Sequence, residues 1–321
     1  MAVHIAYVVD QNFADGAVVS AVSAIKNNQD TKIHFHFIFP SQSLDTISQI
    51  KNELKEMNAE VSIYPFDLKE VDQFNLSGEK RIRSDKNKIS FTKTVFGKLL
   101  LPELLKIDRV IFIDCDTLVG NCLKEMESIK ISDNIIAAVI DKSERKILND
   151  TILKEYKLKN YYNTGLMIMD LVKLREFNFI EQCLRCEEEI SHSKPFADQD
   201  LINITLKENI FSLEEKFNIQ VWYNIPKKEF VESIHKFENG IIHFVGPVKP
   251  WHDWCRPLAR ELWEKYSKTL RKYQITRLKI EKFQQLHLYS ESLDADEQYK
   301  DASVLKSSLI KRLLDHIVKN K

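Results

Sequence analysis

Two acidic residues, two positions apart, follow the segment with the strongest strand signal in the chain. Residues 109–113 read Arg-Val-Ile-Phe-Ile, and Asp114 and Asp116 come directly after them. In a loop beyond a buried strand, both carboxylates can converge on one divalent cation, because hard cations prefer oxygen ligands. Such a cation could neutralise a diphosphate and assist its departure as a leaving group. The pattern alone is weak evidence, since acids after a strand often cap a helix.

Three further polar clusters have a spacing that suits ligand binding. Residues 162–165 (Tyr-Asn-Thr-Gly) precede an apolar run, and residues 197–200 (Ala-Asp-Gln-Asp) open a helical pattern, where polar side chains lie at the positive end. Farther on, His243 ends an apolar run and Lys249 follows between two prolines. An imidazole can bind a metal and a lysine can pair with phosphate. Taken singly, each cluster could equally be a turn, a helix cap, a core histidine or a solvated charge.

The elements that must position these residues alternate along the chain. Apolar runs predict strands over residues 3–10, 32–39, 60–67, 109–114, 135–141, 161–170 and 241–245, and helices over 16–28, 43–57, 92–105, 172–190 and 198–208. This order predicts an α/β fold with a mostly parallel sheet and helices on both faces. Ligands bind at the carboxyl ends of the strands in such sheets. Asp10, Asp114 and His243 lie at or beside such ends, so we expect them to meet in one crevice.

The Asp-x-Asp-x-Thr pattern also resembles the nucleophile motif of haloacid-dehalogenase-like phosphatases. Asp114 would then be phosphorylated and Asp116 would act as acid and base. That motif usually stands at the first strand of its sheet, whereas three strands are predicted before it here. It also requires a later acidic motif with a glycine, which residues 197–200 lack. The phosphatase is therefore the alternative rather than the main hypothesis.

Glycine is scarce in this chain, with seven in 321 residues. No two are spaced to make G-x-G-x-x-G or G-x-x-x-x-G-K-[ST], which excludes the glycine-rich phosphate-binding loops. A bound diphosphate would need a metal and a lysine instead. The 47 basic and 47 acidic residues give a formal net charge of zero, so the composition does not support nucleic acid as a partner.

Cysteine usage and the start of the chain bear on the compartment. The first residues lack the pattern of a secretory signal, and the apolar runs are too short for a transmembrane helix. Five cysteines without framework spacing favour reduced thiols, so we expect a cytoplasmic protein. Cys183 and Cys186 have the spacing of a metal or redox pair. They fall within a predicted helix and lack a second pair, so we expect them to be structural.

The C-terminal residues differ in charge from the rest. We divide the chain into a main domain, 1–265, and a basic helical segment, 266–321. Residues 265–283 contain seven Lys or Arg residues and one acidic residue. Residues 305–321 contain five Lys or Arg residues and one acidic residue. An amphipathic basic helix is predicted there, which could lie on an anionic membrane surface or pack on the main domain. The acidic stretch 294–297 is predicted to be a loop. The apolar stripe of this helix consists of Leu305, Leu309, Leu313 and Ile317.

Together and in this order, the motifs resemble those of the family 8 retaining glycosyltransferases of the GT-A fold, especially bacterial lipopolysaccharide galactosyl- and glucosyltransferases. The resemblance covers about residues 3–265 and rests on the Asp-x-Asp, Asn-x-Gly, Asp-Gln-Asp and His-x-x-Gly-Pro-x-Lys-Pro-Trp-His elements. It implies a UDP-hexose donor, Mn²⁺ or Mg²⁺ as cofactor, and an oligosaccharide or lipid-linked saccharide acceptor. With the basic segment, it implies a peripheral enzyme on the inner face of the plasma membrane.

The resemblance also implies roles for individual residues. Asp114, Asp116 and His243 would bind the metal together with the donor diphosphate, and Gly246 and Lys249 would contact phosphate. The remaining donor contacts would come from Val8, Val9, Asp10, Asn12 and Phe13 at the uridine, from Cys115 between the two acids, and from Lys98, Asn163, Asp198 and Gln199 around the sugar.

One position departs from the family pattern. The helix before the Asp-x-Asp strand commonly reads Tyr-x-Arg-Leu in the family, whereas residues 96–99 read Phe-Gly-Lys-Leu here. Lys98 therefore keeps the positive charge of the expected arginine but loses its planar bidentate fork.

Two mechanisms are open for transfer with retained configuration. The resemblance places Gln199 nearest the anomeric carbon, and its amide is a poor nucleophile. This favours front-face attack, in which Gln199 stabilises the developing charge. A covalent intermediate on Asp198 is the rival. Besides the phosphatase, a non-catalytic module that binds sugar nucleotides is a further alternative to a transferase.

Overall fold

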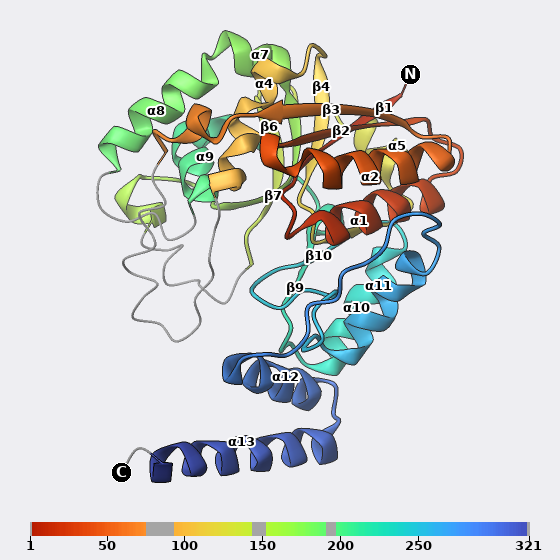
Figure 1. Cartoon of the computed structure of the whole chain (residues 1–321). Helices are drawn as coiled ribbons and strands as arrows, with labels where there is room; N and C mark the ends of the chain where they lie inside the picture. The colour runs from red at the N-terminus through yellow and green to blue at the C-terminus, as the bar shows by residue number, and fades with distance from the viewer. Residues whose placement is uncertain (1, 75–92, 143–151, 191–196, 320–321) are drawn as a thin grey trace.

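A seven-stranded sheet forms the centre of the molecule. The computed structural model describes residues 2–74, 93–142, 152–190 and 197–319, and within them the sheet has the order β3-β2-β1-β4-β7-β6-β8 (Figure 1). The parallel pairs are β1–β2, β2–β3, β1–β4 and β6–β8, whereas β7 is antiparallel to β4 and β6. The predicted mostly parallel sheet is confirmed. Its strands are β1 (Val3–Val8), β2 (Ile33–Pro40), β3 (Glu60–Phe66), β4 (Arg109–Ile113), β6 (Ile136–Ile140), β7 (Tyr162–Asp170) and β8 (Ile210–Ser212).

Helices cover both faces of this sheet, because its strands are apolar on both sides (Figure 1). In β1, Ile5 and Tyr7 belong to one hydrophobic cluster and Ala6 belongs to the other, as alternation along a strand requires. The predicted α/β fold is therefore confirmed. Cys183 and Cys186 are buried in the second cluster, as expected of structural residues. Helices α1 (Ala14–Asn27) and α2 (Leu44–Glu56) contribute to the first cluster, and α7 (Leu171–Glu176), α8 (Phe179–Glu189) and α9 (Asp198–Leu206) to the second.

A second sheet of three short strands positions His243. Its order is β5-β10-β9, with β5 (Thr117–Val119), β9 (Ile219–Val221) and β10 (Ile241–Phe244). β10 runs antiparallel to β5, and His243 is paired with Thr117. Because β5 begins directly after Asp116, this register places His243 beside the Asp-x-Asp motif. The strand predicted over 241–245 exists, but β5 and β9 have three residues each and are too short for periodicity to reveal.

Two predicted helices differ in form from the structure. The segment 92–105 is η3 (Lys93–Leu100), a 3-10 helix, followed by α4 (Leu101–Leu104). A Cβ on Gly97 would lie 3.0–3.1 Å from side-chain atoms of Val8 and Phe66, so close packing shapes this segment. The helix predicted over 172–190 breaks between α7 and α8 at Asn178, which has a φ of 54°. Asparagine tolerates this left-handed conformation. The sequence analysis did not find α5 (Leu123–Ser128), α10 (Lys227–Phe237) or α11 (Pro257–Ser267).

Buried carboxylates bind the start of the C-terminal segment to the main domain. Glu53 of α2 accepts the backbone N–H groups of Arg271 at 2.9 Å, Lys272 at 2.6 Å and Tyr273 at 2.8 Å. The Tyr273 hydroxyl donates to Asp15 of α1 at 3.0 Å. These contacts hold a stretch without regular secondary structure against the two helices. The division into domains at residue 265 stays a prediction.

The segment ends in α12 (Phe283–Ala295) and α13 (Tyr299–Lys319), which lie side by side away from the large sheet (Figure 1). The loop predicted over 294–297 is confirmed in part, because α12 extends through Ala295 and residues 296 and 297 form a turn. Asp296 is buried and forms an ion pair with Arg256, which is also buried. Removing one partner of such a pair leaves an uncompensated buried charge. Charge composition alone did not reveal this distant partner.

The apolar stripe predicted on α13 is partly covered. Leu309 is buried and Leu305 is half-buried, and α12 packs against α13. The other two stripe positions lie beyond the residues whose side chains the structure describes. Across the described residues, none of the helices combines the length and the apolar character needed to cross a bilayer. Among the described side chains of α13, the exposed large apolar ones are Tyr299, Val304 and Ile310.

We expect Glu53→Gln to lower the free energy of unfolding by about 1.5–3 kcal/mol, the range for a hydrogen bond to a charged group. Burial would raise the pKa of Glu53, but the backbone N–H groups of Arg271, Tyr273 and Lys272 hold it below its usual value. A carboxylate with a depressed folded-state pKa stabilises the fold above its unfolded-state pKa of about 4.3, and this contribution is lost as the pH falls through the folded-state pKa.

Urea denaturation at neutral pH and below about pH 4 measures this effect. The difference in stability between wild type and Glu53→Gln should shrink at the lower pH. Glu56→Gln, one turn on and more exposed, is the matched control and should cost less than about 1 kcal/mol. If Glu53→Gln lowered the free energy of unfolding by the same amount at both pH values, the stabilising role assigned to the Glu53 carboxylate would be contradicted.

Candidate active site

A pocket of about 410 Å³ lies at the carboxyl ends of β1, β4 and β10 and at the starts of β7 and α9. Val9 is the one predicted site residue that does not line it, because its side chain is buried in the core and its N–H donates to the Ile38 carbonyl. The structure thus brings the distant predicted segments together. The predicted residues that line the pocket are Val8, Asp10, Asn12, Phe13, Lys98, Asp114, Cys115, Asp116, Asn163, Asp198, Gln199, His243, Gly246 and Lys249.

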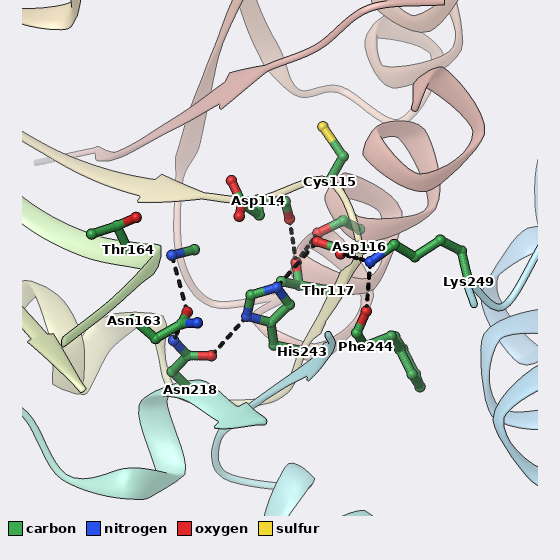
Figure 2. A network of polar contacts seen from close by, with 12 residues as sticks. Asp114, Cys115, Asp116, Thr117, Asn163, Thr164, Asn218, His243, Phe244 and Lys249 are labelled. Atoms are coloured by element: carbon green, nitrogen blue, oxygen red, sulfur yellow. Dashed lines mark hydrogen bonds and ion pairs between the residues drawn. The ribbon is translucent and has the colours of Figure 1, made fainter. Parts of the chain in front are cut away.

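Asp114, Asp116 and His243 form a compact set of metal-binding side chains. One ligand atom from each lies within 4.8 Å of the other two, and His243 Nε2 is 3.3 Å from Asp116 Oδ1 (Figure 2). His243 Nδ1 donates to Asn218 Oδ1 at 3.0 Å, which directs the Nε2 lone pair toward the carboxylates. Two carboxylates and one imidazole fit a divalent cation such as Mn²⁺.

Asn218 orients this set, although the sequence analysis did not identify it. It lies in η5 (Glu215–Asn218) and is buried. Its Nδ2 donates to Asn163 Oδ1 at 2.8 Å, and the same oxygen accepts the Gly165 N–H at 3.1 Å (Figure 2). The amide therefore connects the Asn-x-Gly motif to His243. No sequence signal marks Asn218, because a single asparagine in a short irregular segment is typical of loops.

Two glycines allow the backbone to approach the site closely. A Cβ on Gly165 would lie 2.2 Å from the His243 ring and 2.8 Å from the Asp114 carboxylate. Gly246 has a φ of +88°, and a Cβ there would lie 2.6 Å from the Trp222 ring. Both positions require glycine, for space at the first and for space and backbone conformation at the second.

Lys249 lies beside the metal-binding set. Its ammonium group contacts the Asp116 carboxylate and donates to the Phe244 carbonyl at 2.9 Å (Figure 2). Burial would raise the pKa of Asp116, but the Lys249 ammonium group holds it well below its usual range. Asp116 is therefore ionised, as a metal ligand must be. Lys249 also lines the pocket, so a bound phosphate could reach it.

Lys98 lies between two acids. Its Nζ is 2.7 Å from Asp198 Oδ2 and 3.4 Å from Asp114 Oδ1. Burial would lower the pKa of Lys98, but the charges of Asp114 and Asp198 raise it above its usual value. Burial raises the pKa of Asp198, and Lys98 opposes that shift. Lys98 thus links the Asp-x-Asp and Asp-Gln-Asp motifs as a point charge, with one contact to each acid.

The Gln199 side chain is held at both ends of its amide. Its Nε2 donates to Asp141 Oδ2 at 2.8 Å, and its Oε1 accepts the Thr164 N–H at 3.2 Å. Asn163 Nδ2 also donates to Asp141 Oδ2, at 3.4 Å. The sequence analysis missed Asp141, although it stands at the end of the strand predicted over 135–141. An acid at or beside the carboxyl end of a predicted strand is the signal that identified Asp10 and Asp114.

The remaining wall of the pocket is partly aromatic. Phe13 and Trp251 meet edge to face, with ring centroids 5.9 Å apart. The N–H of Asn12 is bound by Asp10 Oδ1 at 2.9 Å, and the Cys115 thiol donates to the Val8 carbonyl at 3.3 Å. Further lining residues that the sequence analysis did not single out are Thr94, Val95, Gln220, Trp222, Val245 and Leu278.

Comparison with known proteins gives the family. Residues 4–255 match the family described as Glycosyl transferase family 8. The chain is 24% identical over 258 residues to lipopolysaccharide 1,3-galactosyltransferase of Salmonella typhimurium, covering 78% of this chain and 73% of that protein. It is 23% identical over 272 residues to a lipopolysaccharide 1,2-glucosyltransferase of Escherichia coli, covering 78% of this chain and 74% of that protein.

A solved structure shows the same fold. The galactosyltransferase LgtC, in complex with donor and acceptor sugar analogues, matches with a TM-score of 0.69 and 20% identity, covering 84% of this chain and 97% of that one. The predicted GT-A fold is confirmed by this match. Because the family match extends over most of the chain, from residue 4 to residue 255, this chain belongs to glycosyl transferase family 8.

Proposed function

We propose that this chain is a metal-dependent transferase that moves galactose or glucose from a UDP-sugar to a saccharide acceptor, with retained configuration and an α-linkage. The observation that carries the proposal is the convergence of Asp114, Asp116 and His243 with Gln199 in one pocket. The relatives named for lipopolysaccharide transfer support an acceptor of the lipopolysaccharide or lipooligosaccharide core type. Family membership removes the phosphatase alternative, whereas the non-catalytic module still needs an experimental test.

In this proposal Asp114, Asp116 and His243 hold the metal. When bound, Mn²⁺ supplies positive charge that neutralises the donor diphosphate and assists its departure. Lys249 supplies a second positive charge at the same place, and Gly246, which lines the same pocket, contacts phosphate. Asp10, Asn12 and Phe13, with Val8, hold the uridine, whereas Val9 packs in the core and does not reach the pocket.

We favour front-face attack for the transfer step. Gln199 carries an amide, and its oxygen already accepts the Thr164 N–H. Asp198 is buried and bound to Lys98 at 2.7 Å, so its carboxylate would have to leave that ion pair to attack the sugar. In front-face attack a phosphate oxygen of the leaving diphosphate accepts the proton of the acceptor hydroxyl. Gln199 stabilises the positive charge that develops on the sugar.

The basic C-terminal segment is proposed to lie on an anionic membrane surface. Apolar side chains exposed on α13 support this proposal, because Val304 and Ile310 are 65% and 59% exposed. Lys300 and Lys311 are exposed on the same helix. Basic residues near an anionic surface contribute about 1 kcal/mol each, so the helix and the preceding basic stretch together could hold the enzyme near a lipid-linked acceptor.

Asp116→Ala should abolish Mn²⁺-dependent hydrolysis of UDP-hexose, with a loss of at least about 100-fold, because outer partners of metal ligands alone are worth 10- to 100-fold. It should also remove the rise in thermal midpoint that UDP and Mn²⁺ together give the wild type. UDP release by the wild type excludes the non-catalytic module. Asp133→Ala, an exposed acid in a turn, is the control. Retained activity in Asp116→Ala would refute the metal assignment.

Mass spectrometry of enzyme incubated with UDP-hexose and Mn²⁺, without acceptor, tests the transfer step. We expect no hexosyl adduct on the peptide that contains Asp198, because Lys98 holds the carboxylate. Asp198→Asn should lower activity because it takes from Lys98 one of its two carboxylate partners, and not because it removes a nucleophile. A hexosyl group trapped on Asp198 would establish the covalent mechanism instead.

Removal of residues 299–321 should weaken binding to vesicles that contain phosphatidylglycerol and leave donor hydrolysis largely unchanged. This deletion keeps α12 and the buried Asp296–Arg256 pair and removes the packing of Leu309 against α12, so circular dichroism would verify that the shortened chain folds. In the full chain, Ile310→Glu should weaken vesicle binding. Val172→Glu, at an exposed apolar position of α7, should not. Vesicle binding that survives the deletion would defeat the membrane proposal.

A further inference from the structure

Three histidines lie together on the large sheet, toward the amino-terminal ends of its strands. His4 is on β1, and His34 and His36 are on β2. His4 is paired in register with His34, which is in turn paired with Glu60 of β3. None of these residues lines the pocket, which is formed at the opposite ends of the strands. The proposed transferase activity therefore leaves this cluster without a role.

The ring nitrogens of the cluster are close enough to share one ion. One nitrogen from each ring lies within 4.8 Å of the other two, and His4 Nδ1 is 2.9 Å from His36 Nε2. His34 and His36 occupy alternate positions of one strand and so share a face, with ring centroids 4.3 Å apart. Nitrogens around a tetrahedral zinc ion lie about 3.3 Å apart, given Zn–N distances of about 2.0–2.1 Å. Small side-chain rotations would reach that spacing.

Hydroxyl groups of β3 bind the outer nitrogens of two of these rings. His34 Nε2 is 2.8 Å from Ser62 Oγ, and His36 Nδ1 is 3.2 Å from Tyr64 Oη. A hydroxyl can accept the N–H of an imidazole that uses its other nitrogen for a metal, which is the usual arrangement around metal-bound histidine. His34 Nδ1 then faces Glu60, whose Oε2 is 3.5 Å away, and His36 Nε2 faces His4.

The rings are also in the form that binds a metal. Burial and the neighbouring imidazoles lower the pKa of His36 to about 3. Burial and His34 likewise lower the pKa of His4. Both rings are therefore neutral at physiological pH, as metal ligands must be. The His34 side chain is 23% exposed, so an ion can reach the cluster from solvent.

We propose that His4, His34 and His36 form a second metal site, which binds Zn²⁺ or a similar divalent transition ion through one nitrogen of each ring and takes its fourth ligand from the exposed side, where Glu60 lies 3.5 Å from His34 Nδ1. Imidazole ligands suit zinc, whereas carboxylate-rich sets suit manganese and magnesium. The cluster therefore differs in metal preference from the set in the pocket. An ion bound there would connect β1, β2 and β3 through their side chains and stabilise this edge of the sheet.

Titration of the full chain with Co²⁺, free of any purification tag, tests the site. The visible absorption of four-coordinate Co²⁺ reports binding, and Zn²⁺ serves as competitor. Asp116→Asn removes the pocket site, and we expect this variant still to bind one equivalent of Co²⁺ that Zn²⁺ displaces. Zn²⁺ should also raise the thermal midpoint of this variant, because an ion that binds only the folded state stabilises it.

In the Asp116→Asn background, His34→Gln and His4→Gln should each weaken Co²⁺ binding at least about tenfold. Both positions are partly exposed, and circular dichroism would verify that the variants fold. His235→Gln, at an exposed position of α10, is the matched control and should leave binding unchanged. The proposal is overturned if Asp116→Asn binds no Co²⁺, or if both histidine variants bind it as tightly as their parent.

Discussion

Two buried lysines offset the negative charge of the pocket, and the arrangement of the site depends on them. Asp114, Asp116 and Asp198 all line one cavity, and like charges in a poorly solvated site would keep some of these groups protonated. Lys249 contacts Asp116, and Lys98 contacts the other two acids. The three carboxylates can therefore lie close together before any ligand binds, and an incoming cation meets Asp116 with its pKa already held low by Lys249.

The orientation of the site comes from side chains that no ligand needs to touch. Asn218 fixes His243 on one side and Asn163 on the other, and Asp141 fixes Gln199. A buried polar network of this kind holds few alternative arrangements, because each unsatisfied partner would cost a hydrogen bond. The candidate metal ligands and the residues proposed to face the sugar are thus parts of one hydrogen-bonded network. This suits the proposed reaction, in which the diphosphate and the sugar must be held relative to each other.

Elements with strong periodicity could be predicted from the sequence, and those set by tertiary contact could not. The long apolar strands and the residues at their carboxyl ends gave the sheet and most of the pocket. The short strands β5 and β9 and residue Asn218 carry no local signal, although they decide where His243 lies. The charge pattern of the C-terminal segment did not reveal that Asp296 is buried, because its partner Arg256 is 40 residues away in sequence. Asp141 differs from Asn218, because its position at the end of the strand predicted over 135–141 was a sequence signal that could have identified it.

Lysine in place of the arginine expected at position 98 has a consequence for the sugar end of the pocket. A guanidinium could bind one carboxylate with two parallel hydrogen bonds, whereas an ammonium distributes single contacts among several acceptors. Lys98 does the latter, with a nearer contact to Asp198 and a longer one to Asp114. A cation that draws Asp114 away would strengthen the remaining contact of Lys98 to Asp198. Donor binding would then hold Asp198 more firmly in its ion pair, which leaves the half-buried Gln199 as the group best placed to face the sugar.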